Sequence, residues 1–111
     1  MPHIILEYTD TMNIDVPKIL TELHHNLSGQ DTINIHAIKT RAIPVKYVIV
    51  GDGQEPDKMM HITLKLLPGR DDALKKTMAQ GLFDTAKAHA HDDRISVTAE
   101  VVDLHEASYT K

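Results

Sequence analysis

Hydrophobic residues recur along the chain with two periods, one typical of strands and one typical of amphipathic helices. Apolar or alternating runs predict four strands, at residues 3–9, 33–41, 59–67 and 95–104. Apolar residues at helical spacing predict two helices, at residues 16–27 and from Leu74 to Ala90. The predicted order is therefore strand, helix, strand, followed by the same three elements again.

Polar and turn-forming residues mark the limits of these elements. Asp15 is placed to cap the first helix, and Asp71 and Asp72 are placed to cap the second. Between the two halves, a β-prone run at residues 45–50 ends at the turn signal Gly51-Asp52-Gly53. This central segment predicts a short hairpin. The polar tail at residues 105–111 is expected to be ordered only by a neighbouring subunit.

The two halves of the chain resemble each other at an offset of 58 residues, which places His3-Ile4-Ile5-Leu6 over His61-Ile62-Thr63-Leu64. We therefore expect one domain spanning residues 1–111, with internal repeats at about residues 2–50 and 59–105. Each crossover is long enough to join parallel strands in the right-handed sense. The predicted fold class is α+β: a duplicated β-α-β unit that forms a four-stranded mixed sheet with two helices on one face, plus the short central hairpin.

The predicted sheet leaves one face without helices. The strands read as too apolar for that face to be solvated, and monomers rarely expose a large apolar patch. We therefore expect other subunits to cover it.

Composition and residue spacing argue against several classes of function. A net charge of −4 without a run of Lys or Arg argues against a nucleic-acid surface, and the absence of Cys excludes disulfide and thiolate chemistry. No signal peptide or apolar run long enough to span a bilayer is present, so we expect a cytoplasmic protein and no membrane partner. The 8 histidines lack the i, i+4 spacing of a helical metal pair, so no metal site is expected.

Candidate chemistry lies at the start of the chain. If Met1 is removed, Pro2 carries a secondary amine at the amino terminus, and such an amine has an ordinary pKa of about 8. Desolvation and nearby cations lower this pKa, which allows the amine to act as a base near neutral pH. Lys39 and Arg41 lie two residues apart on one face of a predicted strand, where they form a pair of cations. His3 and its repeat equivalent His61 are interpreted as structural.

Five motifs resemble the tautomerase superfamily, and within it the 5-carboxymethyl-2-hydroxymuconate isomerase family. They are PHIILEYTD at residues 2–10, IKTR at 38–41, GDGQ at 51–54, HITLKL at 61–66 and PGR at 68–70. The resemblance covers nearly the whole chain. It implies a homotrimer that catalyses a cofactor-free keto–enol isomerisation, formally an intramolecular oxidoreduction, of a small carboxylated 2-hydroxydienoate.

The resemblance also implies roles for individual residues. Pro2 is the proton-transfer base, and Lys39, Arg41 and Arg70 bind the substrate. Lys39 stands where the family motif has arginine, and lysine lacks the bidentate fork that matches a carboxylate. The number of carboxylates on the substrate is therefore left open.

Two alternatives remain open at the level of sequence. The chain could be a non-catalytic trimeric binding protein of the same fold, or it could use Pro2 for another reaction of the superfamily, such as dehalogenation or decarboxylation. If Met1 is retained, the Pro2 nitrogen is a tertiary amide without basicity, and neither the isomerisation nor those reactions can use it.

Overall fold

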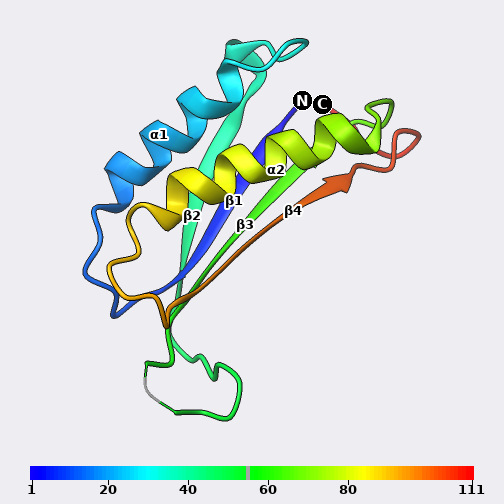
Figure 1. Ribbon diagram of the computed structural model, residues 1–111. Coiled ribbons are helices and arrows are strands. Elements are labelled where there is room, and N and C mark those ends of the chain that lie inside the picture. The colour runs from blue at the N-terminus through cyan, green and yellow to red at the C-terminus, as the bar shows by residue number, and fades with distance from the viewer. Residues whose placement is uncertain (55) are drawn as a thin grey trace.

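The computed structural model describes residues 1–54 and 56–111 and contains two α-helices and four strands (Figure 1). The first half consists of β1 (His3–Thr9), α1 (Val16–Ser28), a short 3-10 turn (Ile35–Ala37) and β2 (Lys39–Val45). The second half consists of β3 (Met59–Leu66), α2 (Asp72–Lys87) and β4 (Ser96–Asp103). Among the described residues, no helix is long and apolar enough to cross a membrane.

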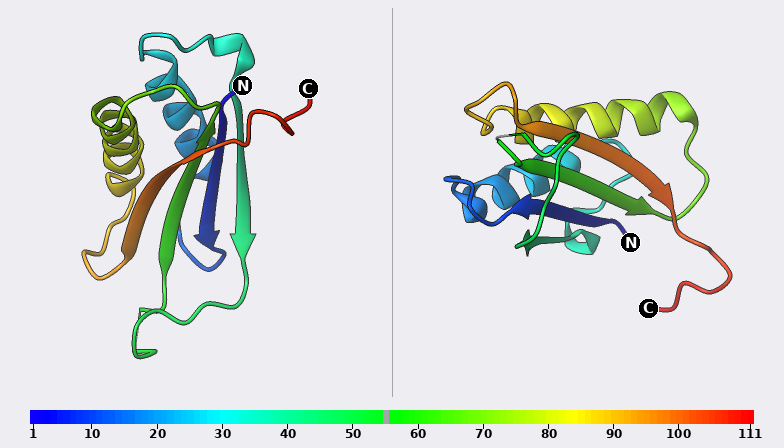
Figure 2. Two further views of the ribbon diagram at one scale, coloured as in Figure 1. Left: turned by 90° about the vertical axis from the view of Figure 1, so that its right-hand side faces the viewer. Right: turned by 90° about the horizontal axis from the view of Figure 1, so that it is seen from below.

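The strands form one mixed sheet in the order β2-β1-β3-β4. Strand β1 runs parallel to β2, β3 runs parallel to β4, and the two central strands β1 and β3 are antiparallel. Both helices cover the same face of this sheet (Figures 1 and 2). The predicted α+β fold class, with a four-stranded mixed sheet and two helices on one face, is confirmed.

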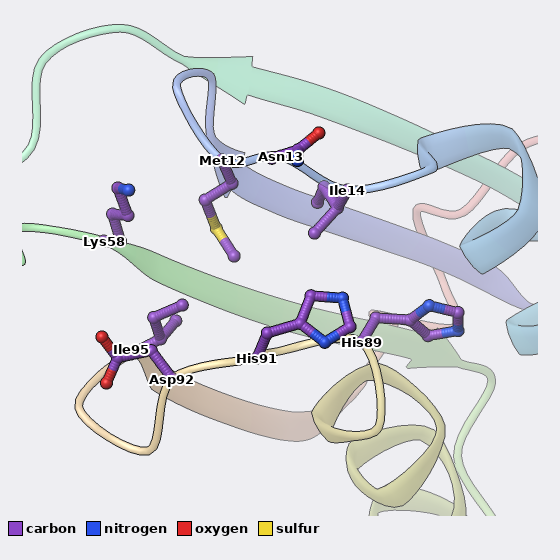
Figure 3. Close-up of a pocket in the computed structure, with 8 residues that line it drawn as sticks. All are labelled: Met12, Asn13, Ile14, Lys58, His89, His91, Asp92 and Ile95. Atoms are coloured by element: carbon purple, nitrogen blue, oxygen red, sulfur yellow. The ribbon is translucent and has the colours of Figure 1, made fainter.

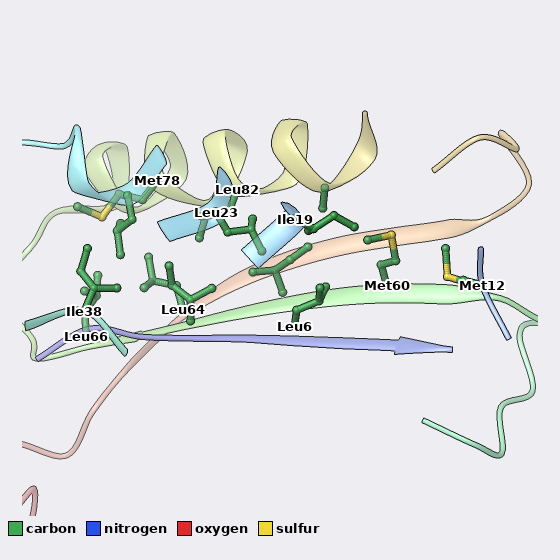
Figure 4. Packing of buried hydrophobic residues seen from close by; sticks show 14 of the residues in the cluster. Leu6, Met12, Ile19, Leu23, Ile38, Met60, Leu64, Leu66, Met78 and Leu82 are labelled. Atoms are coloured by element: carbon green, nitrogen blue, oxygen red, sulfur yellow. The ribbon is translucent and has the colours of Figure 1, made fainter. Parts of the chain in front are cut away.

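The core lies between the helices and the sheet (Figure 4). Helix spacing brings Ile19, Leu23 and Leu27 of α1 to one face, while alternate positions of the central strands contribute residues such as Leu6 and Ile62. The helix starts are fixed as predicted, because the Asp15 side chain accepts a hydrogen bond from Lys18 N at 3.2 Å. The Asp71 side chain does the same for Leu74 N at 2.9 Å.

Two predictions about the middle of the chain were wrong. The strand expected at residues 33–41 begins only at Lys39, because the Asn34 side chain caps a 3-10 turn over Ile35–Ala37 by accepting a hydrogen bond from His36 N. The expected hairpin is also missing: residues 46–54 and 56–58 form no strand. The side chains of Tyr47 and Ile49 in this segment are 85% and 82% exposed, so it is not packed on the rest of the chain as a hairpin strand would be.

The sheet face away from the helices is mostly polar, not apolar as expected. The strand register places His3, Lys39 and Lys65 side by side on this face, and Glu7, His61 and Thr98 side by side further along it. The His61 side chain hydrogen-bonds both Thr98 and Glu100. The expectation failed because the apolar residues of β1 and β3 concentrate on the helix-facing positions.

Candidate active site

Pro2 lies at the start of β1 and is buried. Its carbonyl oxygen accepts a hydrogen bond from Lys39 N at 3.0 Å, which extends the parallel pairing of β1 with β2 by one step. Lys39 is therefore fixed beside the amino terminus by the backbone itself.

The amino terminus lies in a basic environment. The pKa of the amine, carried here by Met1, is lowered from its ordinary value of 8.0, first by burial. The positive charges of Lys111, Arg70 and Lys39 lower it further. The structure thus brings two of the predicted substrate-binding residues, Lys39 and Arg70, to the predicted base, and it adds Lys111 to the same cluster of charges.

Arg70 follows β3 and is held by the segment between α1 and β2. Its guanidinium donates to the Leu67 carbonyl at 3.4 Å and to Thr32 Oγ1 at 3.3 Å. Thr32 has a φ of 71°, a left-handed conformation that is uncommon for a β-branched residue and costs conformational energy. The Nε atom of Arg70 is buried and has no hydrogen-bond partner within residues 1–54 and 56–111. An unpaired buried donor is costly, so the guanidinium is held in this position at some expense in stability.

Arg41 lies two residues after Lys39 in β2, on the same face of the sheet, and pairs with Ile5 of β1. Its side chain is exposed, and its Nη1 atom lies 3.0 Å from Nδ1 of His3. The charges of Lys39 and Arg70 lower the pKa of the amine, whereas the Arg41 side chain contacts the neighbouring His3 instead.

His3 and Tyr109 also lie in this region, and the sequence did not assign them to the site. The hydroxyl of Tyr109 lies 2.7 Å from Nε2 of His3, and the two rings meet edge to face. The pKa of His3 is lowered from 6.5, chiefly by burial and then by Arg41, Lys39, the amino terminus and Lys65. The position of His3 next to Pro2 was a usable signal, whereas nothing in the polar tail distinguished Tyr109.

The tail is ordered by the chain itself, contrary to expectation. Leu104 N donates to the Leu66 carbonyl at 2.6 Å, and Ser108 N and Tyr109 N both donate to the His105 carbonyl. This turn directs the last residues back toward the start of the chain (Figure 2). The prediction failed because a contact over 106 positions leaves no local pattern in the sequence.

A separate hollow of about 250 Å3 lies at the opposite end of the sheet (Figure 3). It is lined by Met12, Asn13, Ile14, Lys58, His89, His91, Asp92 and Ile95. None of the predicted site residues reaches it, and His89 is already paired with Glu22 at 2.9 Å. In the described part of the chain, no three His, Asp or Glu side chains gather as a metal site would require.

Known proteins resemble the chain in sequence and in fold. The profile of a family described as 5-carboxymethyl-2-hydroxymuconate isomerase matches residues 2–111. The 5-carboxymethyl-2-hydroxymuconate Delta-isomerase of Escherichia coli is 25% identical over 111 residues, which cover 95% of this chain and 88% of that protein. The crystal structure of a 5-carboxymethyl-2-hydroxymuconate isomerase from Deinococcus radiodurans R1 matches with a TM-score of 0.89 and 28% identity, covering 99% of this chain and 87% of the other. A fused 4-OT symmetric trimer shares the fold, with a TM-score of 0.75 and 14% identity over 92% of this chain and 86% of its own.

Proposed function

The chain belongs to the 5-carboxymethyl-2-hydroxymuconate isomerase family, and from this membership we propose that it is a keto–enol isomerase that acts on a carboxylated 2-hydroxydienoate with Pro2 as the base. The observation that carries the proposal is the electrostatic environment of the amino terminus. Burial and three cations lower the pKa of the amine that Met1 carries here, and we expect the same surroundings to lower the pKa of the Pro2 nitrogen once Met1 is removed, which favours its action as a base.

The proposed reaction moves one proton along a conjugated dienol and needs no change in oxidation state overall. After removal of Met1, the Pro2 nitrogen takes a proton from one position of the substrate and returns it to another, so that the enol becomes a conjugated ketone. Because the same nitrogen takes and returns the proton, the chemistry requires only a base and stabilisation of the charge that develops on the 2-oxygen.

The cations supply that stabilisation in the proposal. The Arg70 guanidinium contributes a positive charge near the amine and is held in place by Thr32 and the Leu67 carbonyl. A cation that is already held in position needs little reorganisation during the reaction. Lys39 is fixed to Pro2 through the backbone and adds a second positive charge.

We also propose a homotrimer. The helices leave one face of the sheet uncovered, and the exposed side chains of Tyr47 and Ile49 project from the loop after β2. The shared fold of the fused 4-OT trimer supports this assembly. Sedimentation equilibrium measures the mass directly: a trimer has three times the monomer mass of 12.4 kDa, and a monomeric or dimeric protein would refute this part of the proposal.

The decisive experiment combines mass spectrometry with an ultraviolet assay. Mass spectrometry first establishes that Met1 is absent from the sample. Ketonisation of 2-hydroxydienoates is then followed by absorbance, with mono- and dicarboxylated substrates in parallel. Catalysed ketonisation supports the isomerase, whereas a demethionylated protein that binds these dienols without converting them is a binding protein. Release of halide or carbon dioxide from suitable substrates would instead indicate one of the other reactions of the superfamily.

A further inference from the structure

The turn between α1 and β2 contains the only residue other than glycine with a positive φ within residues 1–54 and 56–111. The Ile33 amide closes this turn by donating to the Gln30 carbonyl at 3.4 Å. Thr32 occupies the third of the four positions with a φ of 71°, whereas Asp31 at the second position has no positive φ. This pattern is typical of a type II turn, whose third position is usually glycine because an L side chain is strained there. A β-branched residue at this position therefore needs an explanation from outside the turn.

The Thr32 side chain makes a contact that glycine could not make. A guanidinium has only donors, so Oγ1 of Thr32 accepts the hydrogen bond from Arg70 Nη2 at 3.3 Å. The Leu67 carbonyl accepts a second bond from Nη1 of Arg70 at 3.4 Å. Two atoms of the guanidinium are thereby held, although a long arginine side chain loses much conformational entropy when it is fixed. Glycine would relieve the turn but would leave only the Leu67 contact.

The contact between Thr32 and Arg70 joins two segments that flank the start of β1. Thr32 precedes β2 and Arg70 follows β3, and both of these strands pair with β1. The register places His3 between Lys39 of β2 and Lys65 of β3. The segment before β2 and the segment after β3 therefore lie at the same end of the sheet as the amino terminus. The charge of Arg70 lowers the pKa of the amine there.

We propose that Thr32 is a positioning residue, which holds the Arg70 guanidinium beside the amino terminus even though its own backbone is strained. Two locally unfavourable features meet in this contact: the φ of Thr32, and the buried Nε of Arg70 that has no partner in the described part of the chain. Such features gather at functional sites, where position matters more than stability. The inference rests on the proposed function, in which Arg70 stabilises charge on the substrate, and adds the residue that fixes Arg70.

Three variants of the demethionylated protein separate position from stability. Thr32→Gly removes the hydroxyl and relieves the strain, so its urea midpoint stays at or above that of wild type. Its kcat/KM for a carboxylated dienol falls about fivefold, mainly through KM, which is the effect of one hydrogen bond. Thr32→Ser keeps the hydroxyl and retains the wild-type kcat/KM. The matched control is Thr11→Gly, in the turn after β1, where φ is not positive; it lowers the urea midpoint slightly and leaves kcat/KM unchanged.

A second measurement follows the Arg70 side chain itself and needs no activity. Nε of Arg70 is buried, so its hydrogen exchanges slowly with solvent and can be followed by nitrogen-15 NMR. Thr32→Gly loosens the guanidinium and accelerates this exchange at least tenfold, whereas Thr32→Ser leaves it unchanged. In an Arg70→Ala background, Thr32→Gly has no further effect on kcat/KM, because the two residues act as one unit.

Three results would overturn the positioning role. They are a Thr32→Gly protein whose Arg70 Nε hydrogen exchanges as slowly as in wild type, one with faster exchange but the kcat/KM of an active wild type, and one that loses activity together with stability, as a merely structural turn would. The isomerase proposal is judged separately. If wild type does not convert dienols while Thr32→Gly accelerates the exchange without loss of stability, Thr32 still positions Arg70 and the proposed reaction falls.

Discussion

The Tyr109 hydroxyl lies 2.7 Å from Nε2 of His3 and fastens the last turn of the chain beside its first strand. This contact brings the tail to the same end of the sheet as the amino terminus, where the charge of Lys111 acts on the amine. The candidate site is therefore assembled from both ends of the chain, from Lys39 and Arg41 of β2 and from Arg70 after β3.

Replacement of the proposed base tests the reaction most directly. Pro2→Ala keeps an amine at the amino terminus but loses the secondary amine and its rigid ring, so we expect kcat to fall by about 100-fold, the lower end of the range for proton transfer. Sedimentation equilibrium on the same sample should show an unchanged assembly. Full activity of this variant on dienol substrates would rule out Pro2 as the base.

Arg70 should act mainly on binding of the anionic substrate. Arg70→Ala removes the buried Nε donor and the guanidinium held by Thr32, and we expect the KM for a carboxylated dienol to rise at least tenfold. Steady-state kinetics by absorbance measure this change. Arg94→Ala is the control, because Arg94 pairs with Asp92 at the far end of the sheet. Equal KM values for the Arg70 and Arg94 variants would remove Arg70 from the site.

The pH dependence of the rate should report the charges around the amine. A base must lose its proton to act, so kcat/KM rises with pH through the pKa of the Pro2 amine. The surroundings that lower the pKa of the Met1 amine below 8.0 are expected to lower that of Pro2 as well. Lys39→Met removes one of the cations that lower this pKa. The pKa therefore rises, and the rising limb of the profile moves to higher pH. Lys18→Met, on the exposed side of α1, is the control and should leave the midpoint of this rise unchanged. An unchanged midpoint in the Lys39 variant as well would contradict a role for the Lys39 charge.

The contact between the two helices offers a test of stability. A Cβ added at Gly81 of α2 would lie 2.6 Å from Oδ1 of Asn26 on α1, which is too close for both to keep their positions. Because Oδ1 ends a flexible side chain that can rotate away, we expect Gly81→Ala to stabilise the wild-type protein by less than helix propensity alone would give. In an Asn26→Ala background the clash is absent, and the same substitution should stabilise the protein by about 0.5–1 kcal/mol through helix propensity. Urea unfolding measures all four proteins, and additive effects would show that the two residues do not interfere.

Local patterns predicted the helices, the central strands and the sheet. Their signals are short-range: the Asp15 and Asp71 caps lie within three residues of the amides they bind, and each apolar stripe repeats every turn. The start of β2 was missed because Asn34 offers the backbone an alternative bond, and side chains that do so compete with strand formation.

The neighbours of the amino terminus could be predicted only in part from the sequence, and the candidate site itself remains a prediction. Pro2 and Lys39 could be named from the sequence, and strand pairing joins them through one backbone hydrogen bond. Arg41 was assigned to the site as well, but its contact is with His3, which had been interpreted as structural. Tyr109 and Thr32 were missed because each acts through a side-chain contact across the fold, and neither contact leaves a periodic signal.

The meeting of the two chain ends has a practical consequence for anyone who prepares this protein (Figure 1). A permanent affinity tag on the amino terminus would turn the Pro2 nitrogen into an amide. A tag on the carboxyl terminus would add residues directly after the turn that positions Tyr109 and could displace it. A protein tagged at either end would then look inactive for reasons unrelated to its native chemistry.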